Sequence, residues 1–431
     1  MADRTDNADC CIAGGGPAGM VLGLLLARAG LDVTVLEKHA DFLRDFRGDT
    51  IHPSTMELMA ELGLADKVLG LRHTKVSSFA LEGQGIRVVV GDLRRLRTPF
   101  PYIVFVPQWD FLDLLAAEAR SSPGFRLLMN AEARELVTDD GVVRGVRYMG
   151  PDGEHEVRAP LTIAADGRDS RLRDAAGLEP VETSAPMDVL WFRLPRRPDE
   201  PEGVALRPGA GHVMVMINRF SYWQLGYVIL KGSERQVRAA GLEAFRASVA
   251  ALHPGLSDRV GEIAGWEQVK LLTVRSNRLR RWYRPGLLCI GDAAHAMSPI
   301  GGVGINVAIQ DAVVAANVLV GPLRSGRLQH RHLWEVQARR TIPVRVVQAF
   351  QNLLQSRVAG PLLRSSSPLA GDGPGGGESR SRLPRIAALL QRLPFLQWVP
   401  ARLIGHGVWR VHPRRDLRRP SGGGGVTTIT G

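Results

Sequence analysis

Three stretches of this sequence place glycine residues near an acidic residue, a combination that suits the binding of a nucleotide-like ligand. In the first, Gly14, Gly16 and Gly19 form the pattern G-x-G-x-x-G, and Glu37 follows at the end of the next apolar run. The glycines let the backbone approach a pyrophosphate, the start of the following helix favours its negative charge, and the carboxylate can bind a ribose hydroxyl. This arrangement predicts a dinucleotide site.

The other two stretches lie far along the chain. In residues 291–306, Asp292 follows an apolar run and could accept hydrogen bonds from sugar hydroxyls, while the glycine-rich turn after it offers backbone N–H groups to an anion. In residues 162–173, the pair Asp166-Gly167 also ends an apolar run and is surrounded by arginines. Either stretch alone could be an ordinary loop, but three such turns in one chain indicate a single large cofactor.

Strands and helices at definite places are needed to hold these turns. Apolar periodicity predicts strands at residues 8–13, 31–37 and 286–290, and helices at residues 20–29 and 307–314. Gly30 stands where the first of these helices should end. The order of strand, turn, helix and strand is that of an α/β dinucleotide-binding fold.

Taken together, the motifs resemble those of the single-component FAD-dependent aromatic hydroxylases, the para-hydroxybenzoate hydroxylase-like flavoprotein monooxygenases. They occur in the order of that family and frame roughly residues 8–330. The resemblance implies an α/β fold in which a Rossmann-like FAD-binding domain is interleaved with a mixed-sheet substrate domain, plus a helical C-terminal region. The domains would be residues 1–75, 100–180 and 278–330 for FAD, 76–99 and 181–277 for the substrate, 331–420 for the helical region and 421–431 for a disordered tail.

The same resemblance implies which residues hold FAD. The first motif would bind the pyrophosphate, Glu37 the adenosine ribose and Asp292 the ribityl chain. The turn at residues 299–306 would lie along the pyrimidine edge of the flavin, where a helix N-terminus stabilises the anion of reduced flavin. Asp166 would serve both FAD and the nicotinamide co-substrate. The full set of predicted cofactor-binding residues is Gly14, Gly16, Pro17, Ala18, Gly19, Glu37, Lys38, Arg47, Gln108, Asp166, Gly167, Asp292, Pro299, Gly302, Gly304, Ile305 and Asn306.

A sheet over the flavin would carry the substrate site. Alternating apolar residues predict strands at residues 77–81, 86–90, 188–194, 211–217 and 222–229. The candidate substrate contacts are Trp191, Met214, Met216, Trp223, Gln224 and Tyr227. For each of them the alternative is a place in the sheet core or at a domain interface. His52 and His212 are candidate catalytic bases, although a capping or packing role is the simpler interpretation.

The activity that the resemblance implies is hydroxylation of an aromatic, quinone-like or polyketide substrate. NADPH or NADH would reduce FAD, O2 would add to give a flavin C4a-hydroperoxide, and its terminal oxygen would pass to an electron-rich carbon. Two alternatives remain. One is a related flavoenzyme, such as a halogenase, a Baeyer–Villiger oxygenase or a flavin-dependent reductase, and the other is a non-enzymatic flavin-binding protein.

Composition narrows the partners and the compartment. The 431-residue chain has a net charge of +12, but no helix-turn-helix, zinc-finger or aromatic-plus-basic pattern suggests a nucleic-acid partner. Cys10, Cys11 and Cys289 have neither disulfide nor zinc spacing, so we expect no metal site and a reducing, cytoplasmic location. The acidic start and three consecutive glycines argue against interpreting residues 11–29 as a signal peptide or a membrane span.

The C-terminal part is expected to be helical at residues 333–354 and to continue through a Gly/Ser/Pro-rich linker at residues 365–381. Residues 383–400 mix Leu, Phe and Trp with Arg, and a basic amphipathic segment of this kind can lie on an anionic membrane surface. Packing of this segment against the body is the simpler explanation. The sequence leaves open whether the chain is a monomer or a homodimer.

Overall fold

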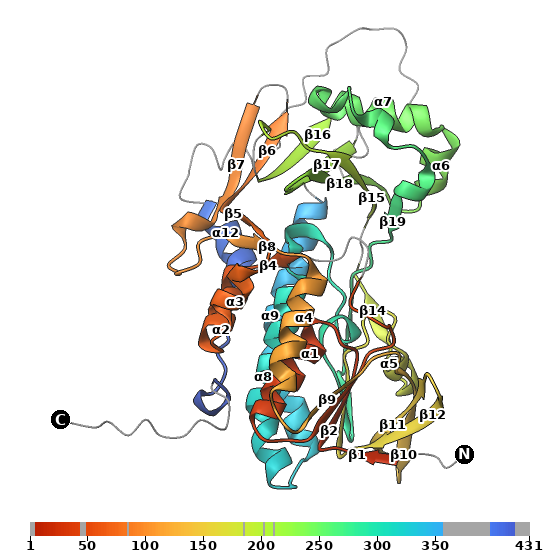
Figure 1. Cartoon of the computed structure of the whole chain (residues 1–431), viewed down its shortest axis with the longest axis vertical. Coiled ribbons are helices and arrows are strands. Elements are labelled where there is room, and N and C mark those ends of the chain that lie inside the picture. The colour runs from red at the N-terminus through yellow and green to blue at the C-terminus, as the bar shows by residue number, and fades with distance from the viewer. Residues whose placement is uncertain are drawn as a thin grey trace, which may run out of the picture.

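A six-stranded sheet lies in the lower half of the molecule (Figure 1). The computed structural model describes residues 5–43, 49–83, 86–183, 186–200, 203–209, 212–356 and 397–418. In spatial order the strands are Tyr283–Arg284 (β21), Leu287–Cys289 (β22), Leu161–Ala164 (β13), Cys10–Ala13 (β2), Val33–Leu36 (β3) and Phe125–Leu128 (β9). All except β21 run parallel, so their carboxyl ends share one edge of the sheet.

Both faces of this sheet are covered, which explains the continuous apolar runs in its sequence. Every residue of β2, β3, β13 and β22 is buried. Helices Pro17–Arg28 (α1), Gln108–Arg120 (α4) and Gly304–Arg324 (α8) pack together in the main core. A second sheet packs on the other side and consists of Thr5–Asn7 (β1), Gly153–Arg158 (β12), Val142–Gly150 (β11) and Glu132–Asp139 (β10).

A seven-stranded sheet forms the upper part of the molecule (Figure 1). Its strands, in spatial order, are Lys270–Leu272 (β19), Met187–Pro195 (β15), Tyr222–Leu230 (β18), His212–Arg219 (β17), Val204–Gly209 (β16), Ser78–Gly83 (β6) and Ile86–Asp92 (β7). Helices Glu234–Ala239 (α6) and Leu242–Leu252 (α7) cover its upper face. The sequence predicted five of these strands and missed β16 and β19. The β16 strand pairs in parallel with β6 and so joins the two chain segments that build the sheet.

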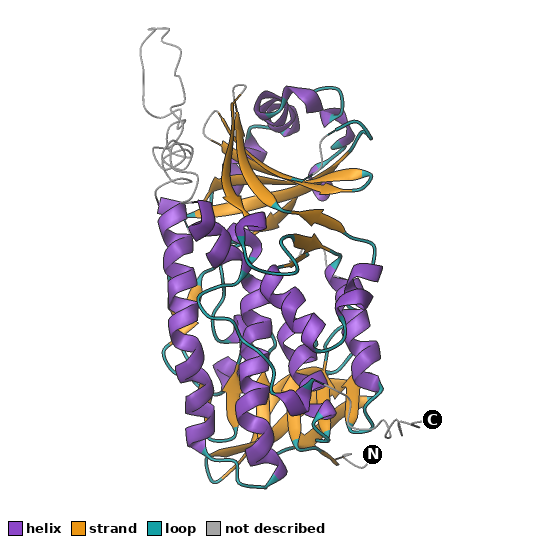
Figure 2. Cartoon of the chain, turned by 90° about the vertical axis from the view of Figure 1, so that its left-hand side faces the viewer, coloured by secondary structure: helices purple, strands orange, loops and turns teal. Residues whose placement is uncertain are grey.

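Small elements connect the upper and lower parts. Figure 2 shows the molecule from the side, with the long helices running from below the upper sheet down alongside the lower sheet. A three-stranded sheet contains Thr50–Ile51 (β4), Ile103–Phe105 (β8) and Thr74–Val76 (β5). A two-stranded sheet contains Pro180–Glu182 (β14) and Asn277–Leu279 (β20). The short helices are Pro53–Glu61 (α2), Ala65–Gly70 (α3) and Arg171–Ala175 (α5).

The helical C-terminal region begins with His330–Leu354 (α9), close to the predicted bounds, and includes Trp398–Gly405 (α12). The predicted linker at residues 365–381, most of the segment at 383–400 and the tail at 421–431 lie outside the described residues. The helical stretch at residues 300–324 is long and apolar enough to cross a membrane, but 83% of its apolar 18-residue window is buried inside the fold. It therefore serves as a core helix. The expected α/β architecture with a helical C-terminal region is confirmed.

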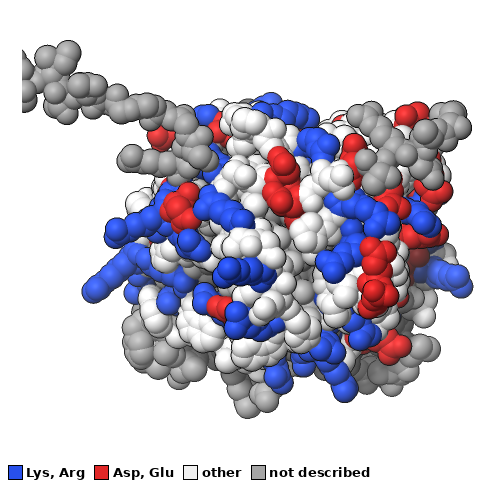
Figure 3. All heavy atoms as spheres, turned by 90° about the horizontal axis from the view of Figure 1, so that it is seen from below, with Lys and Arg blue, Asp and Glu red and all other residues white. Residues whose placement is uncertain are grey.

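The excess of basic residues does not form one stripe on the surface seen from below in Figure 3, where Lys and Arg are interspersed with Asp and Glu. Ion pairs of this kind occur in the four-stranded sheet, where Arg158 reaches Asp139 at 3.0 Å and Arg134 reaches Glu132 at 3.1 Å. Because these pairs are half-exposed, each contributes little to stability.

Candidate cofactor site

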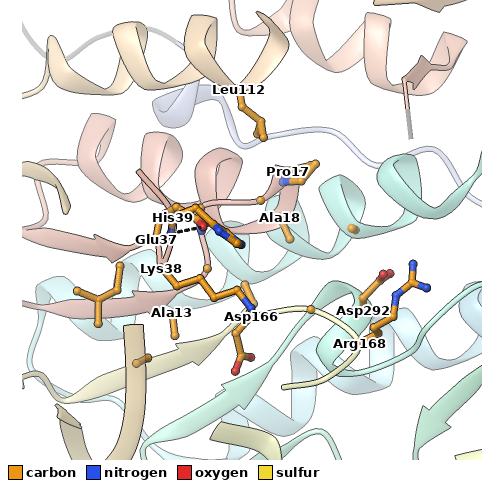
Figure 4. Close-up of a pocket in the computed structure, with 18 of the residues that line it drawn as sticks. Ala13, Pro17, Ala18, Glu37, Lys38, His39, Leu112, Asp166, Arg168 and Asp292 are labelled. Atoms are coloured by element: carbon orange, nitrogen blue, oxygen red, sulfur yellow. Dashed lines mark hydrogen bonds between the residues drawn. The ribbon is translucent and has the colours of Figure 1, made fainter. Parts of the chain in front are cut away.

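A cavity of about 470 Å³ opens at the edge where the parallel strands of the six-stranded sheet end. Residues that follow β2, β3, β9, β13 and β22 all line it, together with residues from the starts of α1, α4 and α8. Its size is that of a small-molecule site, and the edge beyond the carboxyl ends of parallel strands is where open α/β sheets bind ligands. The lining residues drawn in Figure 4 converge from these separate chain segments.

The three glycines of the first motif play different structural roles. Gly14 has a φ of +106°, and a Cβ atom there would lie 2.3 Å from the carbonyl oxygen of Ala165. A Cβ atom at Gly19 would lie 2.0 Å from the carbonyl oxygen of Gly14, so this glycine allows α1 to pack on the turn and does not line the cavity. Gly16 has nothing within 4 Å of such an atom and caps α1 without a side chain. The backbone N–H groups at the start of α1 are therefore open to a ligand from the cavity.

Glu37 lines the cavity beside the glycine turn, and the residue is 7% exposed. Its Oε2 accepts a hydrogen bond from the backbone N–H of Gly15 at 3.0 Å, and its Oε1 accepts one from that of His39 at 3.0 Å (Figure 4). These bonds hold the carboxylate at the cavity wall beside Lys38. The acid predicted to meet a ribose is therefore fixed in position by the two loops that it joins.

Asp166 is a buried carboxylate on the wall of the cavity. Its Oδ2 accepts from the backbone N–H of Leu172 at 3.3 Å, while its Oδ1 is buried and has no hydrogen-bond partner among the described residues. Burial raises the pKa of Asp166 above its usual value. Asp166 thus lines the cavity, while its carboxylate is held by the start of α5. Three carboxylate residues, Glu37, Asp166 and Asp292, line the cavity, and this chemistry fits a cofactor that carries hydroxyl or amide donors.

Only part of the turn at residues 299–306, which was predicted to lie along the flavin, lines the cavity. Asp292, Gly304 and Ile305 line the cavity, as do Gln108 and the predicted residues at 14, 16–18, 37–38 and 166–167. Pro299, Gly302 and Asn306 do not line it, and Arg47 lies outside the described residues. The amide of Asn306 is used inside the protein, because its Oδ1 accepts from the backbone N–H of His52 at 2.9 Å and from the hydroxyl of Thr55 at 2.6 Å. It ties the start of α8 to the segment that leads into α2.

A buried network under the Asp292 turn was not predicted. Asp311 of α8 is fully buried, and its Oδ2 accepts from the backbone N–H of Gly291 at 3.0 Å and lies 2.6 Å from His295 Nε2. Its Oδ1 accepts from Nε of Arg340 on α9, also at 2.6 Å. Burial alone would raise the pKa of Asp311, but His295 and Arg340 hold it below its usual value. The charged carboxylate therefore fixes the turn that presents Asp292.

Four of the six predicted substrate contacts lie on the face of the seven-stranded sheet that packs against α7. Met214, Met216, Trp223 and Tyr227 pack against α7 in a separate core cluster and do not line the cavity at the strand ends. The side chains that face the lower part of the molecule are one position away, as at Val213, Val215 and Val228. Alternation of polarity defines two faces of a strand but does not say which one faces the cofactor.

Trp191 and Gln224 do face the lower part. The indole of Trp191 lies over Gly226, where a Cβ atom would come within 3.0 Å of the ring. The Oε1 of Gln224 accepts from Nε of Arg219 at 2.9 Å, and Arg219 in turn pairs with Asp49, which precedes β4. These contacts join the upper sheet to the lower part of the molecule.

Neither candidate base is placed for proton transfer at the cavity. His212 stacks on Tyr227, with ring centroids 4.6 Å apart, on the side of the sheet that faces α7. His52 is fully buried, and its Nδ1 lies 2.7 Å from the carbonyl oxygen of Ile404 in α12. In this structure His212 packs against Tyr227 and His52 packs under α12, and neither lines the cavity.

His52 should make stability depend on pH. Burial lowers its pKa to about 4, below the ordinary value of about 6.5, so the folded protein binds fewer protons than the unfolded chain. The contribution of neutral, buried His52 to the free energy of unfolding is complete above about pH 6.5. It is lost as the pH falls toward 4, and the loss amounts to about 3 kcal/mol. Urea unfolding of the wild type and His52→Gln at several pH values should show a difference that narrows on acidification. Parallel pH profiles of the two proteins would contradict this.

Several lining residues escaped the sequence analysis. His39, Phe42 and Leu112 line the cavity, as do residues 131–133 after β9. His39 and Phe42 follow the predicted acid Glu37, whereas Leu112 and residues 131–133 belong to segments without a glycine-and-acid pattern. Position relative to a strand end was their only signal, and β9 itself was not predicted.

Comparison with known proteins agrees with this geometry. A family described as "FAD binding domain" matches residues 7–349. The 6-methylpretetramide 4-monooxygenase of Streptomyces rimosus is 33% identical over 398 residues, which cover 90% of this chain and 92% of that protein. The protoasukamycin 4-monooxygenase of Streptomyces nodosus subsp. asukaensis is 27% identical over 338 residues, covering 74% and 81%. The solved structure of p-nitrophenol 4-monooxygenase PnpA from Pseudomonas putida DLL-E4 has a similar fold, with a TM-score of 0.73 at 21% identity, covering 93% of this chain and 97% of that one.

Proposed function

Since this chain belongs to the FAD-dependent aromatic monooxygenases of the para-hydroxybenzoate hydroxylase-like family, we propose that it hydroxylates a polycyclic aromatic substrate of polyketide or quinone type. It is an oxidoreductase that uses FAD, and NAD(P)H and O2 are the co-substrates general to the family. The observation that carries the choice of substrate is the similarity over nine-tenths of the chain to the 6-methylpretetramide 4-monooxygenase.

We propose that FAD occupies the cavity at the strand ends. The start of α1 would hold its pyrophosphate, Glu37 the adenosine ribose and Asp292 the ribityl chain, with the flavin ring toward Gly304 and Ile305. Support comes from the carboxylate residues Glu37, Asp166 and Asp292, which line the cavity, and from the open backbone at Gly16. Bound there, FAD would accept a hydride from NAD(P)H and activate O2 for transfer of one oxygen atom.

The remaining work belongs to side chains of this protein. The apolar face of the upper sheet, at Val189, Val213, Val215 and Val228, packs near Ile300 of the turn before α8. A surface of this kind excludes water and suits a flat apolar substrate. Trp191 and Gln224 remain proposed substrate contacts, because they lie on that side of the sheet.

The test is the absorption spectrum of the purified protein, followed by NADPH or NADH oxidation in air with a panel of polycyclic phenols and quinols. We expect flavin bands, oxidation stimulated by the substrate and a product heavier by one oxygen atom. Ring expansion to a lactone would favour a Baeyer–Villiger oxygenase. Flavin bands without stimulated oxidation would favour a reductase, a halogenase that needs a separate reductase or a non-enzymatic flavin protein. A protein that binds no FAD would contradict the placement of the cofactor.

We further propose a cytoplasmic enzyme, monomeric or homodimeric, that touches the membrane surface through its C-terminal region. Support comes from Trp398, Val399 and Trp409, each close to half exposed, in a segment that also carries Arg402 and Arg410. Exposed aromatic residues beside cations favour an anionic lipid surface. Sedimentation with anionic vesicles should fall when Trp398 and Trp409 are both replaced by Ser, and no sedimentation of the wild type would refute the contact.

A further inference from the structure

One face of α9 carries a stripe of buried polar side chains. The stripe consists of Gln337, Arg340, Gln348 and Gln351 on one side of the helix, followed by Gln355 at its C-cap. The last four are each only 1% exposed. Long polar side chains are rarely buried to this extent unless they are hydrogen-bonded, so the stripe must have partners inside the protein.

The lower part of the stripe holds the chain segment that leads into β22. Gln337 accepts from the backbone N–H of Trp282 at 3.0 Å and donates to the carbonyl oxygen of Arg280 at 2.8 Å. Gln348 donates to the carbonyl oxygens of Asn277 and Ala296, at 2.8 and 3.2 Å. Gln337 and Gln348 therefore bind backbone carbonyls on both sides of the Asp292 turn, and Gln348 also accepts from the Arg278 side chain at 3.3 Å.

The upper part of the stripe holds the turn that precedes α8. The Nε2 of Gln351 donates to the carbonyl oxygens of both Ser298 and Ile300, at 2.8 and 2.9 Å. The Nε2 of Gln355 donates to the hydroxyl of Ser298 at 2.5 Å. From the other side, the hydroxyl of Thr50 donates to the carbonyl oxygen of Gly302 at 2.8 Å.

These bonds fix the orientation of peptide groups in the turn at residues 298–302. In a trans peptide the carbonyl of one residue and the N–H of the next point in opposite directions. Because the carbonyl of Ile300 is bound to Gln351, the N–H of Gly301 points away from α9. Gly301 and Gly302 both have positive φ, at +79° and +62°. Glycine adopts this conformation at little cost, but it adopts other conformations equally easily. A turn with two such residues needs an external support.

We propose that Gln351 is a positioning residue for the flavin, acting through the turn at residues 298–302. This inference rests on the proposed placement of the flavin ring at the start of α8. The single amide group of Gln351 neutralises two carbonyl dipoles that would otherwise be unpaired, and it keeps the turn in register with Gly304 and Ile305 on the cavity wall. Without that amide, the carbonyls add negative potential near the ring and disfavour the reduced, anionic flavin.

The test compares Gln351→Met, which keeps the length of the side chain but cannot donate, with Gln337→Met at the lower end of the same stripe. In the full-length protein as purified, hydrogen exchange of the backbone amides at residues 300–304 should be about tenfold faster in Gln351→Met only. The flavin midpoint potential of this variant should become more negative. Product formed per NAD(P)H consumed should fall roughly 10- to 100-fold, since small misplacements at a reacting centre have effects of that size.

The outcomes separate this inference from the proposed function. Unchanged exchange and potential in Gln351→Met, or the same changes in Gln337→Met, would overturn the positioning role. If Gln351→Met does not fold, Gln355→Met decides, because it removes only the bond to the Ser298 hydroxyl and should give a smaller change in the same direction. If the wild type binds no flavin, the proposed function fails, while the exchange measurement still reports whether Gln351 holds the turn.

Discussion

Replacing Asp311 with Ala is expected to lower the free energy of unfolding by about 3 to 5 kcal/mol, which is a large part of the stability of a typical domain. The carboxylate accepts from Arg340 and from Gly291 and pairs with His295, and all its partners are buried. Removing it leaves the guanidinium of Arg340, 1% exposed, without its counterion. Urea unfolding monitored by tryptophan fluorescence would measure the change.

Two control variants separate this network from ordinary surface charge. Glu335→Ala removes the partner of Arg339 on the same helix, but this pair is more than one-third exposed on both sides and should cost under about 0.5 kcal/mol. The double variant Asp311→Leu with Arg340→Met replaces the buried ion pair by apolar groups and should recover much of the loss. If Asp311→Ala alone costs less than about 1 kcal/mol, the buried network does not hold the Asp292 turn.

Gly14→Ala should weaken FAD binding by about a hundredfold, as expected for the loss of two or three hydrogen bonds to the pyrophosphate. The new Cβ atom would overlap the carbonyl oxygen of Ala165, at 2.3 Å, and the φ of +106° disfavours any residue with a side chain. The turn must therefore move away from both β13 and the start of α1. Titration of the FAD-depleted protein with FAD, followed by flavin fluorescence, would measure the affinity.

Gly16→Ala is the matched control for the effect of Gly14→Ala on stability. Nothing lies within 4 Å of a Cβ atom at Gly16, and its φ of −74° suits alanine. Its stability to urea should stay within about 0.5 kcal/mol of the wild type, whereas Gly14→Ala should be destabilised by more than about 1 kcal/mol. A Gly14→Ala protein that retains FAD through purification would show that the first turn does not carry the pyrophosphate.

Most residues of the proposed cofactor cavity could be predicted from the sequence because they occur in short motifs of neighbouring residues. The glycines at 14, 16 and 19 meet Glu37 within one strand, helix and strand unit, so their spacing alone predicts a shared turn. Asp166 and Asp292 were found for the same reason, since each directly follows a buried strand. Because the strands run parallel, all these turns lie at the same edge of the six-stranded sheet. No local sequence pattern is needed to bring them together.

The substrate side was not readable because it depends on which face of a sheet meets another domain. Met214 and Val213 are both apolar and adjacent, and only the tertiary arrangement assigns the first to α7 and the second to the lower part. The glutamines of α9 posed a different difficulty. Glutamine on a long helix usually marks a solvent-exposed face, and nothing local indicates that Gln351 binds two backbone carbonyls 51 and 53 residues away.

The parallel pairing of β6 with β16 has a consequence for synthesis of the protein. When the ribosome has released the first 150 or so residues, the β6–β7 hairpin is complete, but its partner strand at Val204–Gly209 has not yet emerged. The nascent chain then exposes an open strand edge that can pair with other chains. The open edge is the side of β6 that later pairs with β16. We therefore expect substitutions in β6 to change chaperone dependence and aggregation during expression, even where the finished enzyme tolerates them.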